Sequence, residues 1–419
     1  MLSVSEALKL VLEETVPLPT VTIPLQESRG RILRENVVSD VDIPPFDKAL
    51  MDGYALRSED VAAGIRTFQV VEEILAGSVP QRSLGPGETA RIMTGGPVPS
   101  GADAVVIVEQ SELIPSESQV AQVRIQVPKV LPEQNLLRRG AVSWAGQSVV
   151  SSGILLRAQE IGACVEAGCA TLSVNLQPKV AILATGDELV PAGFPLGPGQ
   201  IRNSNEPMLA AQIEDWGGIP RQLGIAPDHS APLFASIQEG LKSDFLLLSG
   251  GVSAGKRDLV PAQLAAAGVR QVFHKIQMRP GKPLWFGVYE TENPQEDAHR
   301  CLVFGLPGNP VSSMVCADLF VRPALRKSQG IAPPIVPALN VRLSHPFLMQ
   351  GERPTYHPAR IFLDGTELRV EIVDWIGSSD LRSTVSANGT VFLPPGEKQY
   401  EIGDVLGFHS WEQTDLVRR

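Results

Sequence analysis

The spacing of hydrophobic and polar positions changes along the chain, and the first pattern predicts a helix. Near the start, one face of a helical repeat would be apolar, through Val4, Ala7, Leu8, Val11 and Leu12. This spacing is typical of an amphipathic helix. Ser3 and Glu6 have the spacing of a capping box, which predicts that the helix begins directly after Ser3.

Residues 45–142 show a different pattern, in which short β-type runs are separated by turn residues. The clearest runs are residues 68–71, 104–108 and 123–127. They predict a small β-rich domain. The flanking segments, residues 1–44 and 143–177, are helical with strand-like edges. We expect these flanks to form one domain from two separated segments, with the β-rich domain inserted between them.

Residues 178–327 alternate between apolar strand-like runs and helix-like segments. Strand-like runs occupy residues 180–184, 222–226, 245–248, 269–276, 284–288 and 302–304, and helix-like segments occupy residues 206–216 and 227–241. Alternation at this spacing predicts a parallel, doubly wound α/β sheet. The fold class is therefore multidomain α/β plus β.

The tail, residues 328–419, returns to β-type runs. Hairpin-like turns are expected at Asp364-Gly365, Asn388-Gly389 and Pro395-Gly396. These signals predict a small C-terminal β-barrel or sandwich.

The most informative segment is residues 244–258, DFLLLSGGVSAGKRD. A run long enough for a buried strand ends in glycines, and a helix-like segment follows. This arrangement holds phosphate, because free backbone N–H groups converge near the positive end of a helix. Gly250, Gly251 and Ser253 are therefore candidate ligand-binding residues, and the ligand is expected to be a phosphorylated small molecule.

Residues 250–256 also fit the G-x-x-x-x-G-K spacing of a P-loop. In that motif the next residue is Ser or Thr, whose hydroxyl ligates Mg²⁺. This chain has Arg257, which cannot ligate a cation. The sequence therefore disfavours a P-loop nucleoside triphosphatase. The plainer alternative is a glycine turn that only links strand to helix.

Several unusual segments are expected at one rim of the sheet. In open α/β sheets, ligands bind beyond the carboxyl ends of the strands. Four motifs and one acid fall at or near such ends: TGDEL (185–189), Asp228, SGGVSAGKRD (249–258), RPGKP (279–283) and LPGNP (306–310). Their convergence would form a binding site, to which Pro307 and Asn309 would belong.

The expected rim carries both acids and bases. Glu188, Asp228 and Asp258 are candidate Mg²⁺ ligands, because carboxylates beside phosphates commonly hold this cation. Each acid alone could be a helix N-cap, which is the favoured interpretation for Asp228 by itself, whereas the three acids together favour the site.

The candidate oxyanion-binding cations of the rim are Lys275, Arg279 and Lys282. Arg offers a planar fork of donors and Lys a point charge. The alternative for these three residues is a solvated surface.

Two further motifs lie in the β-rich segment, at residues 43–55 and 91–109. Asp52 precedes Gly53, and Thr94 precedes two glycines. They offer a carboxylate and a hydroxyl beside exposed backbone. A pair of tight turns would explain the same composition.

Composition excludes some functions. The chain has 419 residues and a formal net charge of −10, which argues against broad nucleic-acid binding. The four cysteines show no C-x-x-C pair, so a reduced, cytoplasmic protein is expected. No run of 18 apolar residues occurs, so we expect no membrane span.

At these motifs the chain resembles the MoeA family of molybdopterin molybdenumtransferases, to which the E domain of gephyrin is related. The matching motifs, in the family's order, are PPF-D-x3-MDGYA, RIMTGGPVPxGADAVV, NLLRRG, TGDEL, SGGVSAG-x2-D, RPGKP and LPGNPVS. The resemblance spans nearly the whole chain.

The resemblance implies a split elongated domain, an inserted β domain, an α/β molybdopterin-binding domain and a C-terminal β domain. It implies that molybdate is inserted into adenylylated molybdopterin with release of AMP and with Mg²⁺ as cofactor. It also implies a homodimer whose active site lies between the α/β domain of one subunit and the β insertion of the other. The molybdopterin adenylyltransferase is a further candidate partner.

The resemblance also assigns residue roles. Glu188, Asp228 and Asp258 match the pterin-phosphate and Mg²⁺ region, and Asp52 and Thr94 match positions contributed across the dimer. The anion pocket is matched by Lys275, Arg279, Lys282 and Ser312, and the molybdate-binding part of the C-terminal domain by Arg353 and Ser379.

The chain departs from the family at three places. Ala141 and Val142 follow RRG where an acid is common, Arg279 stands where Lys is common, and residues 48–50 replace Asn-Ser-Ala. Two other functions share parts of this pattern. An adenylyltransferase would have the α/β domain alone, and a non-catalytic scaffold would need no reaction.

Overall fold

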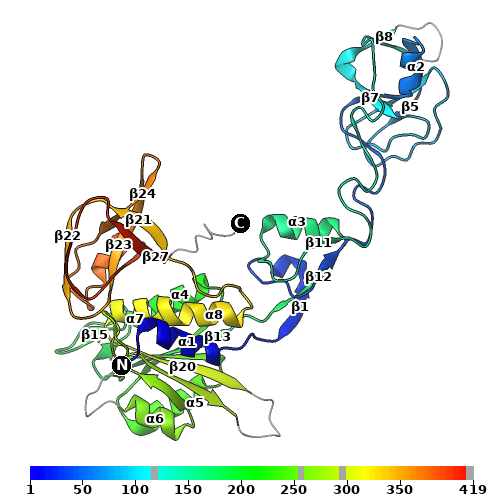
Figure 1. The fold of residues 1–419 in the computed structure, drawn as a ribbon. Helices are drawn as coiled ribbons and strands as arrows, with labels where there is room; N and C mark the ends of the chain where they lie inside the picture. Colours follow the sequence, from blue (N-terminus) through cyan, green and yellow to red (C-terminus); the bar gives the residue numbers. More distant parts are fainter. Residues whose placement is uncertain (115–120, 253–258, 292–298, 412–419) are drawn as a thin grey trace. The chain divides into compact units, whose positions relative to one another are not determined.

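The protein is described by a computed structural model that covers residues 1–114, 121–252, 259–291 and 299–411. The chain divides into two compact units (Figure 1). The larger unit comprises residues 1–22, 30–34 and 173–419, and the smaller unit comprises residues 23–29 and 35–172. No helix among the described residues is long and apolar enough to cross a membrane.

The larger unit is built on a six-stranded sheet in the order β16-β13-β17-β20-β19-β18. Its strands are β13 (Lys179–Thr185), β16 (Ile219–Ala226), β17 (Phe245–Ser249), β18 (Arg270–His274), β19 (Trp285–Glu290) and β20 (Arg300–Leu306). The helices that follow or flank them are α1 (Val4–Glu14), α4 (Asn205–Asp215), α5 (Ser230–Gly240), α6 (Val260–Ala266), α7 (Pro310–Cys316) and α8 (Arg322–Ser328). A π-helical turn, η3 (Ala317–Val321), joins α7 to α8.

The sheet is mixed rather than wholly parallel as predicted. Strands β16, β13, β17 and β20 are parallel, but β19 runs antiparallel to β20 and β18 antiparallel to β19. The reason is the length of the connections. Only residues 275–284 separate β18 from β19, whereas a parallel crossover needs a dozen or more residues.

Both faces of this sheet are covered, as a doubly wound fold requires. Alternate residues of β13 enter different cores: Val180 and Ile182 pack with α1, α4, α7 and α8, whereas Ala181 and Leu183 pack with α5 and α6. Figure 1 shows these two helical layers on opposite sides of the sheet. Side chains that point alternately to the two faces explain why the central strands β13, β17 and β20 are mainly apolar.

The amino-terminal helix forms as predicted. Helix α1 begins after Ser3, whose hydroxyl accepts a hydrogen bond from the Glu6 N–H at 3.2 Å. The Ser3 N–H donates in return to Glu6 Oε2 at 2.7 Å. Ala7 and Val11 are fully buried against the core of the larger unit.

The C-terminal β-type runs form a closed barrel in the order β21-β24-β23-β25-β27. Its strands are β21 (Leu339–Leu343), β23 (Thr355–Asp364), β24 (Glu367–Ile372), β25 (Gly389–Leu393) and β27 (Val405–Ser410), beside the pair β22 (Phe347–Gly351) and β26 (Gly396–Tyr400) and a short helix η4 (Arg382–Ser386). The barrel, rather than the sandwich, is therefore the correct C-terminal fold.

Two of the three predicted hairpin turns of this region are wrong. Pro395-Gly396 connects β25 to β26, but β25 pairs with β23 and β27, whereas β26 pairs with β22. The turn at Asp364-Gly365 joins β23 to β24 as expected, and Gly365 has a φ of +63°. Asn388-Gly389 instead begins strand β25. The Asn388 side chain bonds the backbone of Ile361, and a Cβ at Gly389 would lie 2.2 Å from the Phe408 ring. Glycine is needed here for close packing, not for a turn.

The smaller unit contains a second six-stranded sheet in the order β7-β4-β6-β5-β9-β8. Its strands are β4 (Gly53–Leu56), β5 (Thr67–Ile74), β6 (Glu88–Ile92), β7 (Ala104–Ile107), β8 (Ser111–Ile114) and β9 (Gln122–Ile125), with helix α2 (Ser58–Ala62) and turn η2 (Val108–Gln110). Two small cores pack against its faces, one around Tyr54 and Phe68 and one around Ile74 and Ile92.

Shorter elements complete the fold. They are β1 (Thr20–Pro24), η1 (Leu25–Glu27), β2 (Val37–Val38), β3 (Lys48–Ala49), β10 (Leu136–Leu137), β11 (Ser148–Val150), α3 (Ala158–Glu166), β12 (Thr171–Asn175), β14 (Leu189–Val190) and β15 (Ile201–Arg202). They pair as β1-β12, β10-β3, β11-β2 and β14-β15. All four cysteines are free thiols.

Candidate functional site

The larger unit has a cavity of about 1010 Å³ at the carboxyl ends of its parallel strands, here called the rim cavity. The segments that follow β13, β16, β17 and β20 line it, together with the turn at residues 279–283. Arg353 and residues of the 375–381 segment line it from the C-terminal region. Segments far apart in the sequence therefore meet here, as the motif positions predicted.

Most of the predicted site residues line the rim cavity. They are Glu188, Asp228, Gly250, Gly251, Arg279, Lys282, Pro307, Asn309, Ser312, Arg353 and Ser379.

The other predicted residues are not among the described residues that line the cavity. Lys275 follows β18 and is not among the residues that line the cavity. Asp52 and Thr94 belong to the smaller unit. Ser253 and Asp258 lie outside the described residues.

The glycines after β17 allow the loop to approach the end of β13 closely. Gly250 has a φ of +96°, and a Cβ there would lie 2.7 Å from the Thr185 carbonyl oxygen. Gly251 has a φ of +66°, and its Cβ would lie 2.6 Å from Val260. A side chain at either position would clash with neighbouring atoms. It would also require a backbone conformation that is disfavoured for residues other than glycine. The loop can therefore present its backbone to the cavity.

Hydrogen bonds tie the converging segments together. Asn205, at the start of α4, donates to Ser249 Oγ at 2.6 Å and to the Gly308 carbonyl oxygen at 2.8 Å. Asn309 donates to Ser378 Oγ at 2.8 Å. These bonds link the ends of β17 and β20 to the C-terminal region, which makes the rim cavity a preorganised site.

The charges of the rim cavity favour an anion. Four cationic side chains line it, those of Arg202, Arg279, Lys282 and Arg353. Only two carboxylates, Glu188 and Asp228, are among the described lining residues. The described lining thus has an excess of two positive charges.

The donor set also fits Mg²⁺ bound beside a phosphate. Glu188 and Asp228 supply carboxylate oxygens, and the buried Thr185 hydroxyl has no hydrogen-bond partner among the described residues. Mg²⁺ is usually held by one or two carboxylates together with water and phosphate oxygens. No group of three or more His, Cys, Asp or Glu residues in the described part of the chain could hold a metal, and Asp258 lies outside that part.

Several lining residues were not singled out from the sequence. They are Thr185, Arg202, Asn203, Ser204, Asn205, Trp375 and Ser378. Thr185 belongs to the TGDEL motif, so its position could have been recognised. The run of residues 202–205, RNSN, precedes a helix and was indistinguishable from a capping segment. The family resemblance points to Ser379, four residues after Trp375, but nothing in the sequence singles out Trp375 itself.

In the smaller unit, Asp52 and Thr94 are directly bonded. Asp52 Oδ1 accepts hydrogen bonds from the Thr94 hydroxyl at 2.7 Å and from the Thr94 N–H at 2.6 Å. The bond from the hydroxyl, supported by the bond from the N–H, lowers the pKa of Asp52 below its ordinary value. The carboxylate is therefore ionised at neutral pH.

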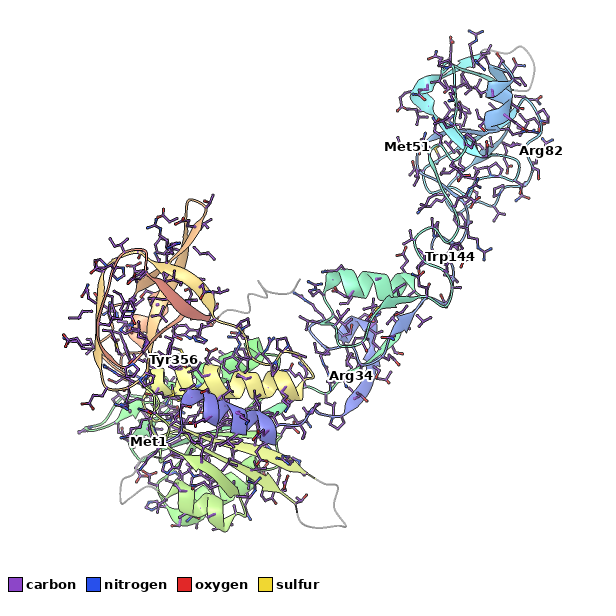
Figure 2. All side chains as sticks on the ribbon, viewed as in Figure 1. Met1, Arg34, Met51, Arg82, Trp144 and Tyr356 are labelled. Carbon is purple, nitrogen blue, oxygen red and sulfur yellow. The ribbon has the colours of Figure 1, made fainter. Side chains whose placement is uncertain are left out.

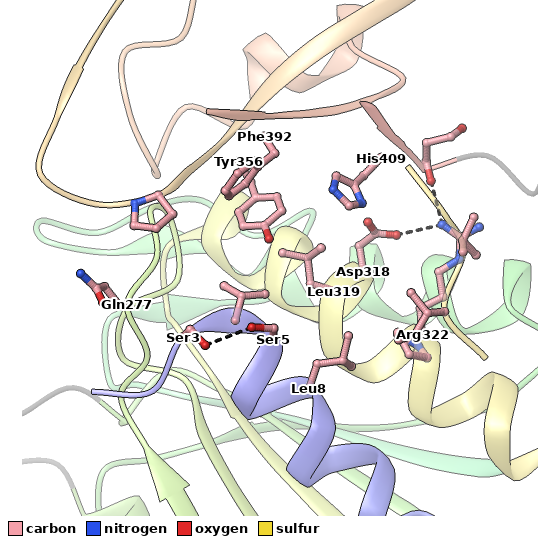
Figure 3. Close-up of a pocket in the computed structure, with 16 residues that line it drawn as sticks. Ser3, Ser5, Leu8, Gln277, Asp318, Leu319, Arg322, Tyr356, Phe392 and His409 are labelled. Carbon is pink, nitrogen blue, oxygen red and sulfur yellow. Dashed lines mark hydrogen bonds and ion pairs between the residues drawn. The ribbon is translucent and has the colours of Figure 1, made fainter. Parts of the chain in front are cut away.

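A second cavity of about 360 Å³ lies where α1 and the π-helical turn meet the barrel (Figure 3). Its walls are mostly apolar, with Leu8, Leu319 and Tyr356 among them. The buried pair of Asp318 and Arg322 also lines it, with Nη1 of Arg322 3.0 Å from Oδ1 of Asp318.

Substitution of Gly250 by alanine is expected to lower the free energy of unfolding of the larger unit by roughly 1–3 kcal/mol. The new Cβ would lie 2.7 Å from backbone oxygen at a φ of +96°. Gly224→Ala is the matched control, because its φ is +80° but no atom lies within 4 Å of the added Cβ. Urea unfolding of both variants separates the steric cost from the conformational one. Equal losses would contradict the close approach of the loop to β13.

Comparisons with known proteins agree with this architecture. The family description "MoeA N-terminal region (domain I and II)" matches residues 2–168, "Probable molybdopterin binding domain" matches residues 181–327, and "MoeA C-terminal region (domain IV)" matches residues 340–411. Together these matches cover most of the chain.

Similar proteins match over nearly their full length. A protein of Nostoc sp. named molybdopterin molybdenumtransferase is 35% identical over 395 residues, which are 92% of this chain and 88% of that protein. A protein of Bacillus subtilis with the same name is 32% identical, over 91% of this chain and 87% of its own length. The solved structure of the molybdopterin biosynthesis MoeA protein of Pyrococcus horikosii is 29% identical and has a TM-score of 0.79 over 98% of this chain and 99% of its own. The chain therefore belongs to the MoeA family.

Proposed function

We propose that this protein is a molybdopterin molybdenumtransferase of molybdenum cofactor biosynthesis. It would bind adenylylated molybdopterin and molybdate, and the phosphoanhydride would be split. AMP would leave, and the dithiolene of the pterin would receive the metal. The names of the two relatives, each at least 32% identical over most of both chains, support this reaction class.

The observation that carries the proposal is the cationic rim cavity. It has the volume for a ligand larger than a simple ion, and its described lining has an excess of positive charge. Both substrates are anionic, since molybdate is a tetrahedral dianion and the pterin carries phosphates. Arg, Lys and hydroxyl donors are suited to such groups.

The lining residues divide between the two substrates by chemistry. The backbone at Gly250 and Gly251, together with the segment containing Pro307 and Asn309, is suited to the phosphates. The side chains of Lys282, Ser312, Arg353 and Ser379 would hold molybdate. Lys275, which lies outside the lining, would act only if its side chain reached the ligand.

We propose Mg²⁺ as the cofactor of the reaction. Glu188, Asp228 and Asp258 would hold it. When bound, Mg²⁺ would neutralise charge on the phosphoanhydride as that bond breaks. Glu188 and Asp228 would each supply a carboxylate oxygen from the lining of the rim cavity.

We further propose that the active enzyme is a homodimer in which Asp52 and Thr94 act on a ligand held by the other copy. The ionised Asp52 carboxylate, held by Thr94, is a candidate second contact for Mg²⁺ or the substrate. Neighbouring exposed apolar side chains on the smaller unit support a partner surface: Leu50 is 43% exposed and Met51 is 44% exposed. Figure 2 labels Met51 in this unit.

The alternatives are less well supported. An adenylyltransferase would need only the α/β domain, whereas the relatives match this chain over 92% and 91% of its length. A non-catalytic scaffold gives no reason for a cationic cavity built from six or more separated segments.

The test supplies the purified full-length chain with adenylylated molybdopterin, molybdate and Mg²⁺ and follows AMP. AMP release that depends on molybdate is the expected result. Release of AMP without any molybdate dependence, or no release, would defeat the proposal. Rapid hydrolysis of ATP alone would instead favour the interpretation of residues 250–257 as the P-loop of a nucleoside triphosphatase.

A further inference from the structure

A cationic side chain of the rim cavity rests on an aromatic ring. The Cζ atom of Arg279 lies 5.5 Å from the centroid of the Trp375 ring, and both residues line the cavity. This distance is within the range of a cation–π contact. Arg279 comes from the turn after β18, whereas Trp375 comes from the segment after β24, so the contact joins the α/β core to the C-terminal region.

The hydrogen-bond donors of the Arg279 guanidinium are not used by the described residues. Within residues 1–114, 121–252, 259–291 and 299–411, no hydrogen bond or ion pair engages its side chain, which contacts the Trp375 ring. A cation–π contact uses no hydrogen-bond acceptor, so the N–H groups that point away from the ring are available to a ligand.

The backbone of Arg279 is fixed independently of its side chain. Its N–H donates to the Pro354 carbonyl oxygen at 2.8 Å, and its own carbonyl oxygen accepts from the Tyr356 N–H at 2.8 Å. The start of the side chain is therefore anchored to β23. Without a further contact, however, the long side chain would still allow the guanidinium to adopt many positions in the cavity.

The Trp375 ring is itself supported from the barrel. It packs edge-on against His357, with ring centroids 5.1 Å apart and planes at 83°, and His357 packs on Phe347 at 5.4 Å. The Trp375 indole nitrogen has no hydrogen-bond partner among the described residues, so packing holds the ring. Burial, with the nearby Arg279 charge, lowers the pKa of His357, so this support stays uncharged.

We propose that Trp375 is a positioning residue that holds the Arg279 guanidinium flat over its ring, so that the donor edge of Arg279 faces a tetrahedral oxyanion or phosphate in the rim cavity. The inference rests on the proposed function only in taking the cavity's ligand to be an anion. It also gives a reason for arginine at position 279, since a planar fork stacks on indole and pairs with two oxygens at once, and lysine does neither.

The test measures binding of inorganic molybdate and of AMP to the full-length protein by calorimetry, without turnover. Trp375→Ala is expected to weaken binding of at least one probe by roughly 3- to 30-fold, the range of a partly desolvated cation–π contact. Trp375→Phe, which keeps an aromatic face, is expected to restore most of the loss. In turnover assays, KM should rise more than kcat falls.

A double-mutant cycle separates positioning from a general structural role. If Trp375 acts through Arg279, the loss caused by Trp375→Ala should shrink to less than about 2-fold in an Arg279→Gln background, which has no cation to place over the ring. An equal loss in both backgrounds, no loss in the single variant, or no binding of either probe to the unmodified protein would overturn the proposal. Normal anion binding and coupling without molybdate-dependent AMP release would instead defeat the proposed function and leave this inference standing.

Discussion

Replacement of Lys282 by alanine is expected to slow molybdate-dependent AMP release by about 10²- to 10³-fold, the effect of removing one preorganised electrostatic contact from an active site. Lys282 lines the rim cavity from the turn at residues 279–283. That turn is closely packed, because a Cβ at Gly281 would lie 2.4 Å from Cys316 Sγ. The ammonium is therefore presented from a fixed backbone, and alanine would remove it without a substitute.

Two further substitutions define what Lys282 contributes. Lys282→Arg keeps the charge and should recover part of the activity, although the fork differs in shape from an ammonium. Lys242 lies just after the carboxyl end of α5, and its amine pairs with Glu239. Lys242→Ala should leave turnover unchanged. If Lys282→Ala reduced the rate less than about 3-fold, molybdate would not be bound through Lys282.

Lys275→Ala tests the sequence-based assignment of Lys275 to the anion pocket. Lys275 has a φ of +70° and is not among the lining residues of the rim cavity. A loss as large as that of Lys282→Ala would show that its side chain reaches the ligand during turnover. A small loss would limit its role to the connection between β18 and β19.

The position of the rim cavity could be predicted because its signals are local. Each glycine or acid motif directly follows an apolar run, and the topology of an α/β sheet brings the ends of those runs together. Gly250 and Gly251 show why such motifs are readable: their positive φ values and the crowding by Thr185 and Val260 leave room only for glycine.

Contacts made across the fold could not be predicted in the same way. Trp375 lies almost a hundred residues from Arg279, and although the family resemblance points to Ser379 nearby, nothing in the local sequence singles out Trp375. Asn205 looks like any polar residue before a helix, yet it bonds two strand ends. Asn388-Gly389 has the composition of a turn, but packing against Phe408 decides its structure. In each case the tertiary partner, not the neighbouring sequence, determines the role.

A second large effect is expected away from the rim cavity, at the buried pair of Asp318 and Arg322 beside the second cavity (Figure 3). Both side chains are only 5% exposed, and Arg322 also donates to the Ser410 carbonyl oxygen at 2.8 Å. Burial raises the pKa of Asp318 to about 6 even though Arg322 lowers it. Burial lowers the pKa of the nearby His409, which favours its neutral form.

Arg322→Met is expected to lower the free energy of unfolding by about 3–5 kcal/mol near pH 8, because it leaves a buried carboxylate without its counter-charge. The loss should be smaller near pH 5. A carboxyl with a raised folded pKa contributes stability at low pH, and that contribution is lost as pH rises through the folded pKa. Without Arg322 the pKa of Asp318 rises above about 6. In the variant, the stability that the protonated carboxyl contributes is therefore lost at a higher pH than in the unmodified protein.

The double variant Asp318→Leu/Arg322→Met isolates the cause. Removal of both charges should restore most of the stability and abolish the difference between about pH 5 and about pH 8, since apolar replacement of a buried pair is often neutral. Urea unfolding at the two pH values, followed by tryptophan fluorescence, measures all three proteins. Trp216 is a suitable reporter, because its ring centroid lies 6.0 Å from Arg322 Cζ. A loss in the single variant that is the same at both pH values would show that lost packing, rather than the unpaired carboxylate, destabilises the protein.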